Sequence, residues 1–405
     1  MSFTNYLCNT VTKIQITIVG LVFLLILAVR CSKTQINNID PYAAIKAAFG
    51  DNIDLNNLAN YANQTRPAYI TKDNTDGNVI TNSKATLGRV LFYDKNLSID
   101  NSISCGGCHK QEFAFSDTAI ASKGVSGGVT ARHSMRLINS RFATERKFFW
   151  DERAATLEQQ TTKPIQDHAE MGFSGQNGRP ALSNLLSKLQ GVTYYNELFK
   201  FVYGDMNVTE ARMQECLAQF VRSIHSFDSK YDAGRIQVPN DGPPFPNLTM
   251  QENTGKQLFL FAPVFNTNGV RIGGGAGCNA CHNAPEFDID PNSKNNGIIG
   301  RIAGAGIDIT VTRAPSLRDV MNRSGIENGP LMHTGNLATL QNAIGHYGTI
   351  TIAVGNNNLD PRLTPNGFGQ QLNFNAQEIN SLMAFIKTLT GTNVYTDKKW
   401  SNPFK

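Results

Sequence analysis

The sequence predicts a mostly α-helical protein of two domains, and three observations support this expectation. Apolar residues recur at steps of three and four, the spacing that places them on one face of a helix, in residues 86–92, 209–231, 250–261 and 376–389. The strict alternation of apolar and polar residues that indicates a half-buried strand is scarce. The pattern C-x-x-C-H occurs once in each half of the chain, so each predicted domain carries one copy.

The beginning of the chain is predicted to be an export signal covering residues 1–31. Residues 14–29 form a nearly unbroken apolar run of 16 residues between Lys13 and Arg30. Because ~20 residues are needed to span a bilayer, a removable signal is favoured over a permanent anchor. The segment before Cys31 resembles a bacterial lipoprotein processing site, although Arg30 stands where a small residue is expected. A lipid anchor at Cys31 and a cysteine without lipid remain two alternatives, and both place the rest of the chain in the periplasm.

The remaining chain divides at the proline-rich residues 239–246, P-N-D-G-P-P-F-P, which are the clearest break in the helical pattern. We expect a helical and linker region over residues 32–80. The first domain then covers residues 81–240, the second covers residues 245–395, and residues 396–405 form a C-terminal strap.

The composition limits the class of protein. The chain has 405 residues, of which 40% are hydrophobic and 17% are charged, and its 37 basic and 32 acidic side chains leave a net charge of +5. These values support a sizeable core and argue against a disordered chain or a nucleic-acid partner. The seven cysteines are too few and too clustered for a disulfide scaffold. Cys216 lies on the apolar face of the helix predicted at 209–231, and we expect it to be a buried thiol.

The two C-x-x-C-H patterns are typical of c-type haem attachment. Two thiols at this spacing can each bond one vinyl group of a haem, and the next residue becomes an axial iron ligand. A zinc ribbon would place its thiol pairs ~15 to 20 residues apart, whereas Cys108 and Cys278 are 278 − 108 = 170 positions apart, and a redox dithiol needs no histidine. The sequence therefore predicts two covalent haem c groups, held by Cys105, Cys108, His109, Cys278, Cys281 and His282.

The sixth iron ligands decide between electron transfer and catalysis. A cytochrome that only transfers electrons keeps both axial positions filled, while peroxide chemistry needs an open position. The residues alone leave many candidates for these ligands, among them methionines, tyrosines, His133, His168, His225, His333 and His346.

Further motifs resemble those of the bacterial di-haem cytochrome c peroxidases, a family that includes the MauG branch. In the first half they are residues 87–98 (L-G-R-V-L-F-Y-D-K-N-L-S), 148–160 (F-F-W-D-E-R-A-A-T-L-E-Q-Q) and 164–171 (P-I-Q-D-H-A-E-M). In the second half they are residues 314–319 (A-P-S-L-R-D), 329–335 (G-P-L-M-H-T-G) and 346–348 (H-Y-G). The resemblance implies a mostly α fold of two cytochrome c-like domains, each with one covalently bound haem c.

The resemblance also implies the roles of several residues. Glu170 falls on the family's distal acid, Gln160 on a distal-pocket glutamine, and Trp150 on a tryptophan between the two haems. A carboxylate over the iron can move a proton between the oxygens of a peroxide. His333 falls on a histidine near the second haem. By composition alone, Glu170 would be a solvated acid and Trp150 a core residue.

The sequence departs from the peroxidases at the second haem. The sixth ligand of that iron falls on Tyr347, where peroxidases with a high-potential second haem have methionine and the MauG branch has tyrosine. A phenolate favours higher oxidation states than a thioether does. Met332 as the ligand, and Tyr347 as a packed tyrosine, remain alternatives.

It also departs at the first haem. Residues 124–127, G-V-S-G, lack the histidine that caps the first iron in peroxidases that need reductive activation. We therefore expect a first haem that is open on its distal side, with His133 as an alternative ligand. His133 also replaces an asparagine that helps to bind calcium, so a calcium ion held with the backbone of Asn328 and Pro330 is an open question.

These inferences predict an oxidoreductase of the cytochrome c peroxidase kind. It would reduce hydrogen peroxide to water with electrons from a small exported donor, a cytochrome c or a copper protein, and the family suggests a homodimer. Two alternatives are kept. One is a MauG-like oxidase acting on a partner protein, and the other is a di-haem electron-transfer cytochrome without catalysis.

Overall fold

The structure, a computed structural model, describes residues 40–405. The predicted export signal and Cys31 lie outside the described residues. Ala44–Lys405 form one compact unit. The described part is mostly helical with four short strands, as the sequence predicts. Within residues 40–405, no helix is long and apolar enough to cross a membrane.

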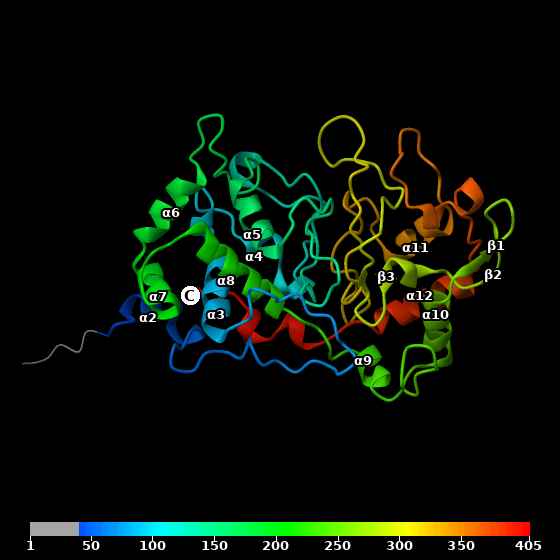
Figure 1. Ribbon diagram of the computed structural model, residues 1–405, viewed down its shortest axis with the longest axis horizontal. Coiled ribbons are helices and arrows are strands. Elements are labelled where there is room, and N and C mark those ends of the chain that lie inside the picture. Colours follow the sequence, from blue (N-terminus) through cyan, green and yellow to red (C-terminus); the bar gives the residue numbers. More distant parts are fainter. Residues whose placement is uncertain (1–39) are drawn as a thin grey trace, which may run out of the picture. The chain divides into compact units, whose positions relative to one another are not determined.

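The helices of the N-terminal half surround a central pair, α3 and α8 (Figure 1). Their bounds are α2 Ala43–Phe49, α3 Asn82–Tyr93, α4 Cys105–Cys108, α5 Leu157–Gln166, α6 Leu182–Gln190, α7 Thr193–Tyr203 and α8 Glu210–Ser223, while the next helix, α9 Lys230–Arg235, lies beside the C-terminal half. The central helices cross at Gly88, where an added Cβ would lie only 1.9 Å from the carbonyl oxygen of Cys216. Glycine therefore permits the close approach of the two backbones. Cys216 is buried, as predicted.

The C-terminal half repeats this arrangement with α10 Met250–Leu260 and α12 Ala376–Lys387. An added Cβ at Gly255 would lie 1.8 Å from the carbonyl oxygen of Ser381. The core around this pair is rich in aromatic rings, namely Tyr231, Phe245, Phe259, Phe287 and Phe385. The other elements are α11 Leu340–Gly348 and two antiparallel pairs, β1 Pro263–Phe265 with β2 Arg271–Gly274 and β3 His282–Asn283 with β4 Asp288–Ile289.

The central helices begin at side chains that accept a hydrogen bond from the first backbone turn, namely Thr81 for α3, Thr209 for α8, Thr249 for α10 and Asn375 for α12. The helices predicted at 86–92, 250–261 and 376–389 are confirmed as α3, α10 and α12. The helix predicted over 209–231 is wrong in its extent, because α8 ends at Ser223. The side chain of Asn139 bonds both the N–H and the C=O of Ser226, at 2.9 and 3.2 Å, which removes this backbone from the helix.

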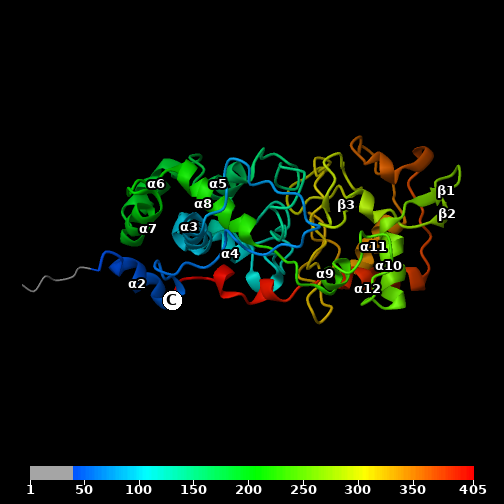
Figure 2. The same ribbon diagram turned by 60° about the horizontal axis from the view of Figure 1, so that its bottom comes forward.

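The C-terminal segment runs back from α12 to the N-terminal half (Figure 2). The Nε of Arg89 donates to the carbonyl oxygen of Ser401 at 2.6 Å, and the Tyr93 hydroxyl donates to that of Trp400 at 2.7 Å. Residues 396–405 therefore lie along α3. Residues 239–246 form the loop between α9 and α10, and their role as a domain boundary stays a prediction.

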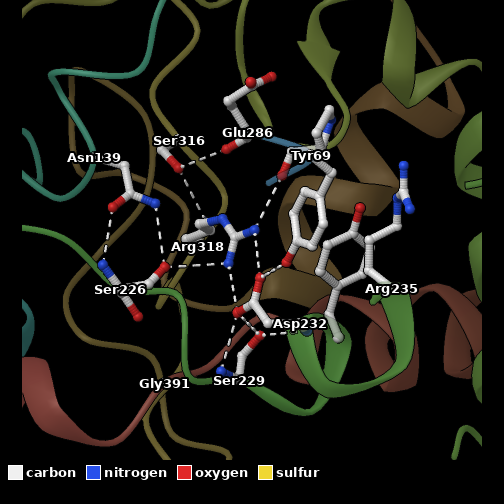
Figure 3. Close-up of polar contacts among 12 residues, drawn as sticks. Tyr69, Asn139, Ser226, Ser229, Asp232, Arg235, Glu286, Ser316, Arg318 and Gly391 are labelled. Carbon is white, nitrogen blue, oxygen red and sulfur yellow. Dashed lines mark hydrogen bonds and ion pairs between the residues drawn. The ribbon is translucent and has the colours of Figure 1, made fainter. Parts of the chain in front are cut away.

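A buried guanidinium fixes the loop of residues 314–319 (Figure 3). Nη1 and Nη2 of Arg318 donate to the two carboxylate oxygens of Asp232 on α9, at 3.0 and 2.9 Å. The Tyr69 hydroxyl donates to the same carboxylate at 2.6 Å. Breaking such a buried pair leaves an uncompensated charge, at a cost of about 3–5 kcal/mol. The loop is therefore held firmly, and it carries Pro315, which contacts the second C-x-x-C-H.

Candidate active site

The first C-x-x-C-H forms one wall of a cavity of about 350 Å³. The residues that the sequence assigns to the first site all line this cavity, and they are Cys105, Cys108, His109, Trp150, Gln160 and Glu170. Gln160 comes from α5, and the cysteines come from the short helix α4. The predicted residues therefore share one space, although they come from several segments of the chain.

The orientation of His109 suits an iron ligand. Its backbone N–H donates to the carbonyl oxygen of Cys105 at 2.8 Å, and its Nδ1 lies 3.2 Å from that of Phe115. A backbone partner at Nδ1 fixes the tautomer with Nε2 unprotonated and free to bind a metal. Burial lowers the pKa of His109, which favours the neutral ring. Gly106 is needed in the turn because an added Cβ would lie 2.4 Å from the ring of Tyr93.

Glu170 is half-buried and lines the same cavity as His109. Burial, and secondarily the nearby Asp167, raise the pKa of Glu170 to about 7, while Arg153 opposes the rise. A carboxyl group with a pKa near neutrality can both accept and donate a proton in the working range of an enzyme. Arg153 also lines the cavity, where its guanidinium stacks 3.6 Å from the centre of the Phe149 ring.

Two glycines that the sequence analysis did not assign support the backbone at Glu170. An added Cβ at Gly124 or at Gly128 would lie 1.9 or 2.6 Å from the carbonyl oxygen of Ala169. The N–H of Val125 donates to the carbonyl oxygen of Glu170 at 3.0 Å. Residues 124–128, the segment that lacks a histidine to cap the first iron, thus pack directly against the backbone of Ala169 and Glu170. The glycines in G-V-S-G-G were a signal of such close backbone contact.

Trp150 lies between two cavities. Residues 148–154 form a tight loop in which Phe149 and Glu152 have positive φ angles of 74° and 53°. The indole Nε1 donates to the carbonyl oxygen of His133 at 2.8 Å, and the carbonyl oxygen of Trp150 accepts the N–H of Arg313 at 3.0 Å. The ring lines both the first cavity and a second one.

The second cavity, of about 370 Å³, is built around the second C-x-x-C-H. Cys278, Cys281 and His282 line it. The Nδ1 of His282 lies 3.1 Å from the carbonyl oxygen of Pro315, so Nε2 is again the free nitrogen. Burial lowers the pKa of His282 to about 4.

Both candidates for the sixth ligand of the second iron line this cavity. The hydroxyl of Tyr347, on α11, and the sulfur of Met332 accept hydrogen bonds from the side-chain amide of Asn296, at 3.1 and 3.3 Å. Burial raises the pKa of Tyr347. Asn296 was not singled out from the sequence, because its contacts reach residues 36 and 51 positions away. Tyr347 and Met332 thus remain alternatives that share one polar partner.

Comparison with known proteins identifies the family of the chain. Residues 82–236 match the family described as "Di-haem cytochrome c peroxidase". The methylamine utilization protein MauG of Methylophilus methylotrophus is 30% identical over 327 residues, which cover 78% of this chain and 84% of the relative. The chain belongs to the di-haem cytochrome c peroxidase family.

Other relatives of this di-haem peroxidase fall in both named branches. The cytochrome c551 peroxidase of Nitrosomonas europaea is 28% identical over 338 residues, covering 80% of this chain and 82% of the relative. The crystal structure of a MauG-like protein associated with microbial copper homeostasis is 27% identical, with a TM-score of 0.64 over 84% of this chain and 99% of that one. The diheme peroxidase BthA from Burkholderia thailandensis, at 20% identity and a TM-score of 0.56, shares the fold over 81% of this chain and 92% of its own.

Two further histidines of the di-haem peroxidase pack around Trp150. The ring of His333 meets the indole edge-on at 6.2 Å between centroids, and its Nε2 lies 3.0 Å from the carbonyl oxygen of Gly300. The Nδ1 of His133 lies 3.0 Å from the carbonyl oxygen of Ala119. Its Nε2 lies 3.5 Å from the hydroxyl oxygen of Ser116, so both ring nitrogens of His133 have partners in the protein. These two contacts favour a structural role for His133 over the alternative of an iron ligand. Within residues 40–405, no group of three or more His, Cys, Asp or Glu is placed to hold a metal ion.

Proposed function

We propose that this di-haem peroxidase is exported and reduces hydrogen peroxide to water in the first cavity, with a haem c at each C-x-x-C-H. One observation carries the proposal: the carboxyl group of Glu170 lines the same cavity as His109, where burial raises the pKa of Glu170 to about 7. A cytochrome that only transfers electrons has no need for such an acid on the distal side of a haem.

The residues around both cavities fit a covalent haem. Each cavity offers a pair of thiols for thioether bonds and a histidine whose Nδ1 is held by a backbone carbonyl, His109 in the first and His282 in the second. When bound, haem c supplies an iron that binds peroxide and exchanges electrons. We assign Tyr347 as the further ligand in the second cavity, with Met332 as the alternative.

Glu170 is the proton carrier of the proposed reaction. Breaking the O–O bond takes up one proton and one electron for each oxygen atom, and both oxygens leave as water. The carboxylate of Glu170 accepts a proton from one oxygen of peroxide and returns it to the other oxygen, which leaves as water. The side-chain amide of Gln160 donates a hydrogen bond that orients peroxide in the same cavity.

Electrons reach the first cavity past Trp150, whose ring lines both cavities. We propose that they come from a small exported electron-transfer protein, a cytochrome c or a copper protein, which docks near the second cavity. A lipid anchor at Cys31, a homodimer and a bound calcium ion remain predictions of the sequence.

The test is the Glu170→Gln variant, matured in a host that attaches haem c. We expect both haems to stay bound and peroxidase turnover to fall at least about 100-fold, because positioned acid–base groups contribute about 10²–10⁴. Glu112→Gln is the matched control, since Glu112 is exposed and does not line the cavity. Wild-type turnover in Glu170→Gln with both haems present would refute the proton role.

A second function is a MauG-like oxidase that acts on a partner protein, and Tyr347 favours it. Slow turnover of reduced cytochrome, together with a long-lived oxidised state after peroxide addition, would support this alternative. An unchanged visible spectrum after peroxide would instead support an electron-transfer protein without catalysis.

A further inference from the structure

Arg136 occupies the boundary between the two cavities. Four residues line both of them, and these are Arg136, Trp150, Arg313 and Pro315. The Nη2 of Arg136 donates to the carbonyl oxygen of Ser316 at 3.3 Å, which joins segments 180 positions apart in the sequence. Ser316 directly follows Pro315, the partner of His282. A guanidinium group is thus held where both candidate haem sites meet.

The charge of Arg136 lacks the partners that neighbouring arginines have. Arg313 pairs with Asp288 at 3.6 Å, and Arg132 pairs with Asp151 and Asp308 at 2.6 and 2.8 Å. In the part of the chain that the structure describes, no carboxylate lies within ion-pair distance of Arg136. Its Nε is buried without a hydrogen-bond partner.

Burial lowers the pKa of Arg136 to about 10, with Asp319 acting against the shift from a longer range. The group therefore remains a cation at neutral pH. A desolvated cation without a counter-ion is costly. Such a site favours the binding of an anion. The planar guanidinium can donate two parallel N–H hydrogen bonds, which match the two oxygens of a carboxylate.

The groups expected in both cavities carry carboxylates of their own, because every haem c has propionate side chains. We propose that Arg136 binds a haem propionate at the boundary of the two cavities. This inference rests on the proposed attachment of haem c, and it adds a contact between the chain and the haem that the C-x-x-C-H motifs do not supply.

A cation in this place has a consequence for the electron transfer. Positive charge beside a haem stabilises the reduced iron, so it raises the reduction potential. Arg136 also acts electrostatically on His282, where its charge adds to the lowering of the pKa by burial. The proposed contact therefore raises the potential of the second haem, the source of electrons for the first.

The experiment compares Arg136→Gln, Arg136→Lys and the control Arg146→Gln in the holoenzyme. Arg146 is exposed, pairs with Asp76 and lines neither cavity. Mass spectrometry first counts the covalent haems. A wild-type protein without two haems would overturn the proposed function itself, which separates that failure from a failure of the propionate contact.

Resonance Raman spectra in the propionate-bending region and a redox titration then test the contact. In Arg136→Gln, we expect a shifted propionate band and a lower midpoint potential of the second haem, while Arg146→Gln matches the wild type. In Arg136→Lys, we expect a shifted propionate band because the planar guanidinium is lost. The midpoint potential of the second haem should stay close to the wild-type value because the positive charge is kept. A purely structural role through Ser316 predicts unshifted propionate bands. Unshifted propionate bands in either Arg136 variant, with both haems attached, would overturn the proposal. If Arg136→Gln does not fold, Arg136→Lys alone tests the contact.

Discussion

The two C-x-x-C-H cavities use the same scaffold and differ in the other side chains that line them. Each lies in a half of the chain that is built on a pair of helices crossing at a glycine, Gly88 in the first and Gly255 in the second. In each, a backbone carbonyl holds the Nδ1 of the motif histidine, which leaves Nε2 as the nitrogen that can bind a metal.

The polar side chains that line the two cavities are unlike each other. The first cavity has the carboxyl group of Glu170 and the amide of Gln160. The second has the hydroxyl of Tyr347 and the sulfur of Met332, groups that can bind a metal. Under the proposed function, the shared scaffold holds a haem in each half, and these few side chains make the first cavity the reacting site and the second the electron-transfer site.

The largest expected effect comes from removing one attachment site. The double variant Cys105→Ala, Cys108→Ala deletes both thioether positions of the first cavity, and we expect mass spectrometry to find one covalent haem in place of two, with no peroxidase turnover. The matching change, Cys278→Ala with Cys281→Ala, should leave the first haem attached. Two covalent haems in either variant would show that the cavities do not attach haem as described.

The next effect is a pH dependence that belongs to the first cavity alone. Burial raises the pKa of Glu170 to about 7, and the carboxylate is the form that accepts the proton. We therefore expect kcat/KM to reach its maximum above about pH 7 and to fall about tenfold for each pH unit below that value. Stopped-flow kinetics of the reaction with peroxide measure this profile. A flat profile in the wild type, or the same slope in Glu170→Gln, would contradict the assignment.

A stability comparison tests whether the two helix pairs are equivalent. Gly88→Ala and Gly255→Ala each force a Cβ against a backbone oxygen, at 1.9 and 1.8 Å, so both should lower the free energy of unfolding by about 1–3 kcal/mol. Gly345→Ala on the exposed face of α11 meets no atom within 4 Å and should stabilise by up to about 1 kcal/mol. Denaturant unfolding of the holoenzyme checks all three. A cost in only one of the crossing variants would show that the halves are not packed alike.

The smallest expected change distinguishes the ligands of the second cavity. Tyr347→Phe removes the phenol, and Met332→Leu removes the thioether with little change in volume. We expect Tyr347→Phe to alter the visible spectrum of the second haem while Met332→Leu leaves it unchanged. The opposite pattern would make Met332 the ligand, and no change in either variant would leave Tyr347 as a packed side chain.

The sequence predicted the helical class, and its short motifs identified side chains that line the two cavities, while the chemical roles of these side chains stay predictions. The C-x-x-C-H patterns and the segments around Trp150 and Glu170 are local in the chain. The first motif, Trp150 and Glu170 line the first cavity, and the second motif lines the second cavity. The extent of the helix predicted at 209–231 was wrong because Asn139, far away in the sequence, bonds the backbone of Ser226.

Contacts between distant segments could not be predicted in the same way. Asn296 reaches Tyr347 and Met332 only once α11 has packed into the second half. The position of Arg136 at both cavities depends on two segments that meet through Ser316. Neither residue belongs to a local pattern with a known chemistry, so the sequence alone does not distinguish it from an ordinary surface residue.

Low-temperature electron paramagnetic resonance of the oxidised wild-type protein tests the difference between the two cavities most directly. The spin state of each ferric haem reports whether its sixth position is filled. The account predicts one high-spin signal, from a haem bound to His109 beside Glu170, and one low-spin signal from the haem bound to His282. Two low-spin signals would mean that both irons are capped, and would contradict a reacting site in the first cavity.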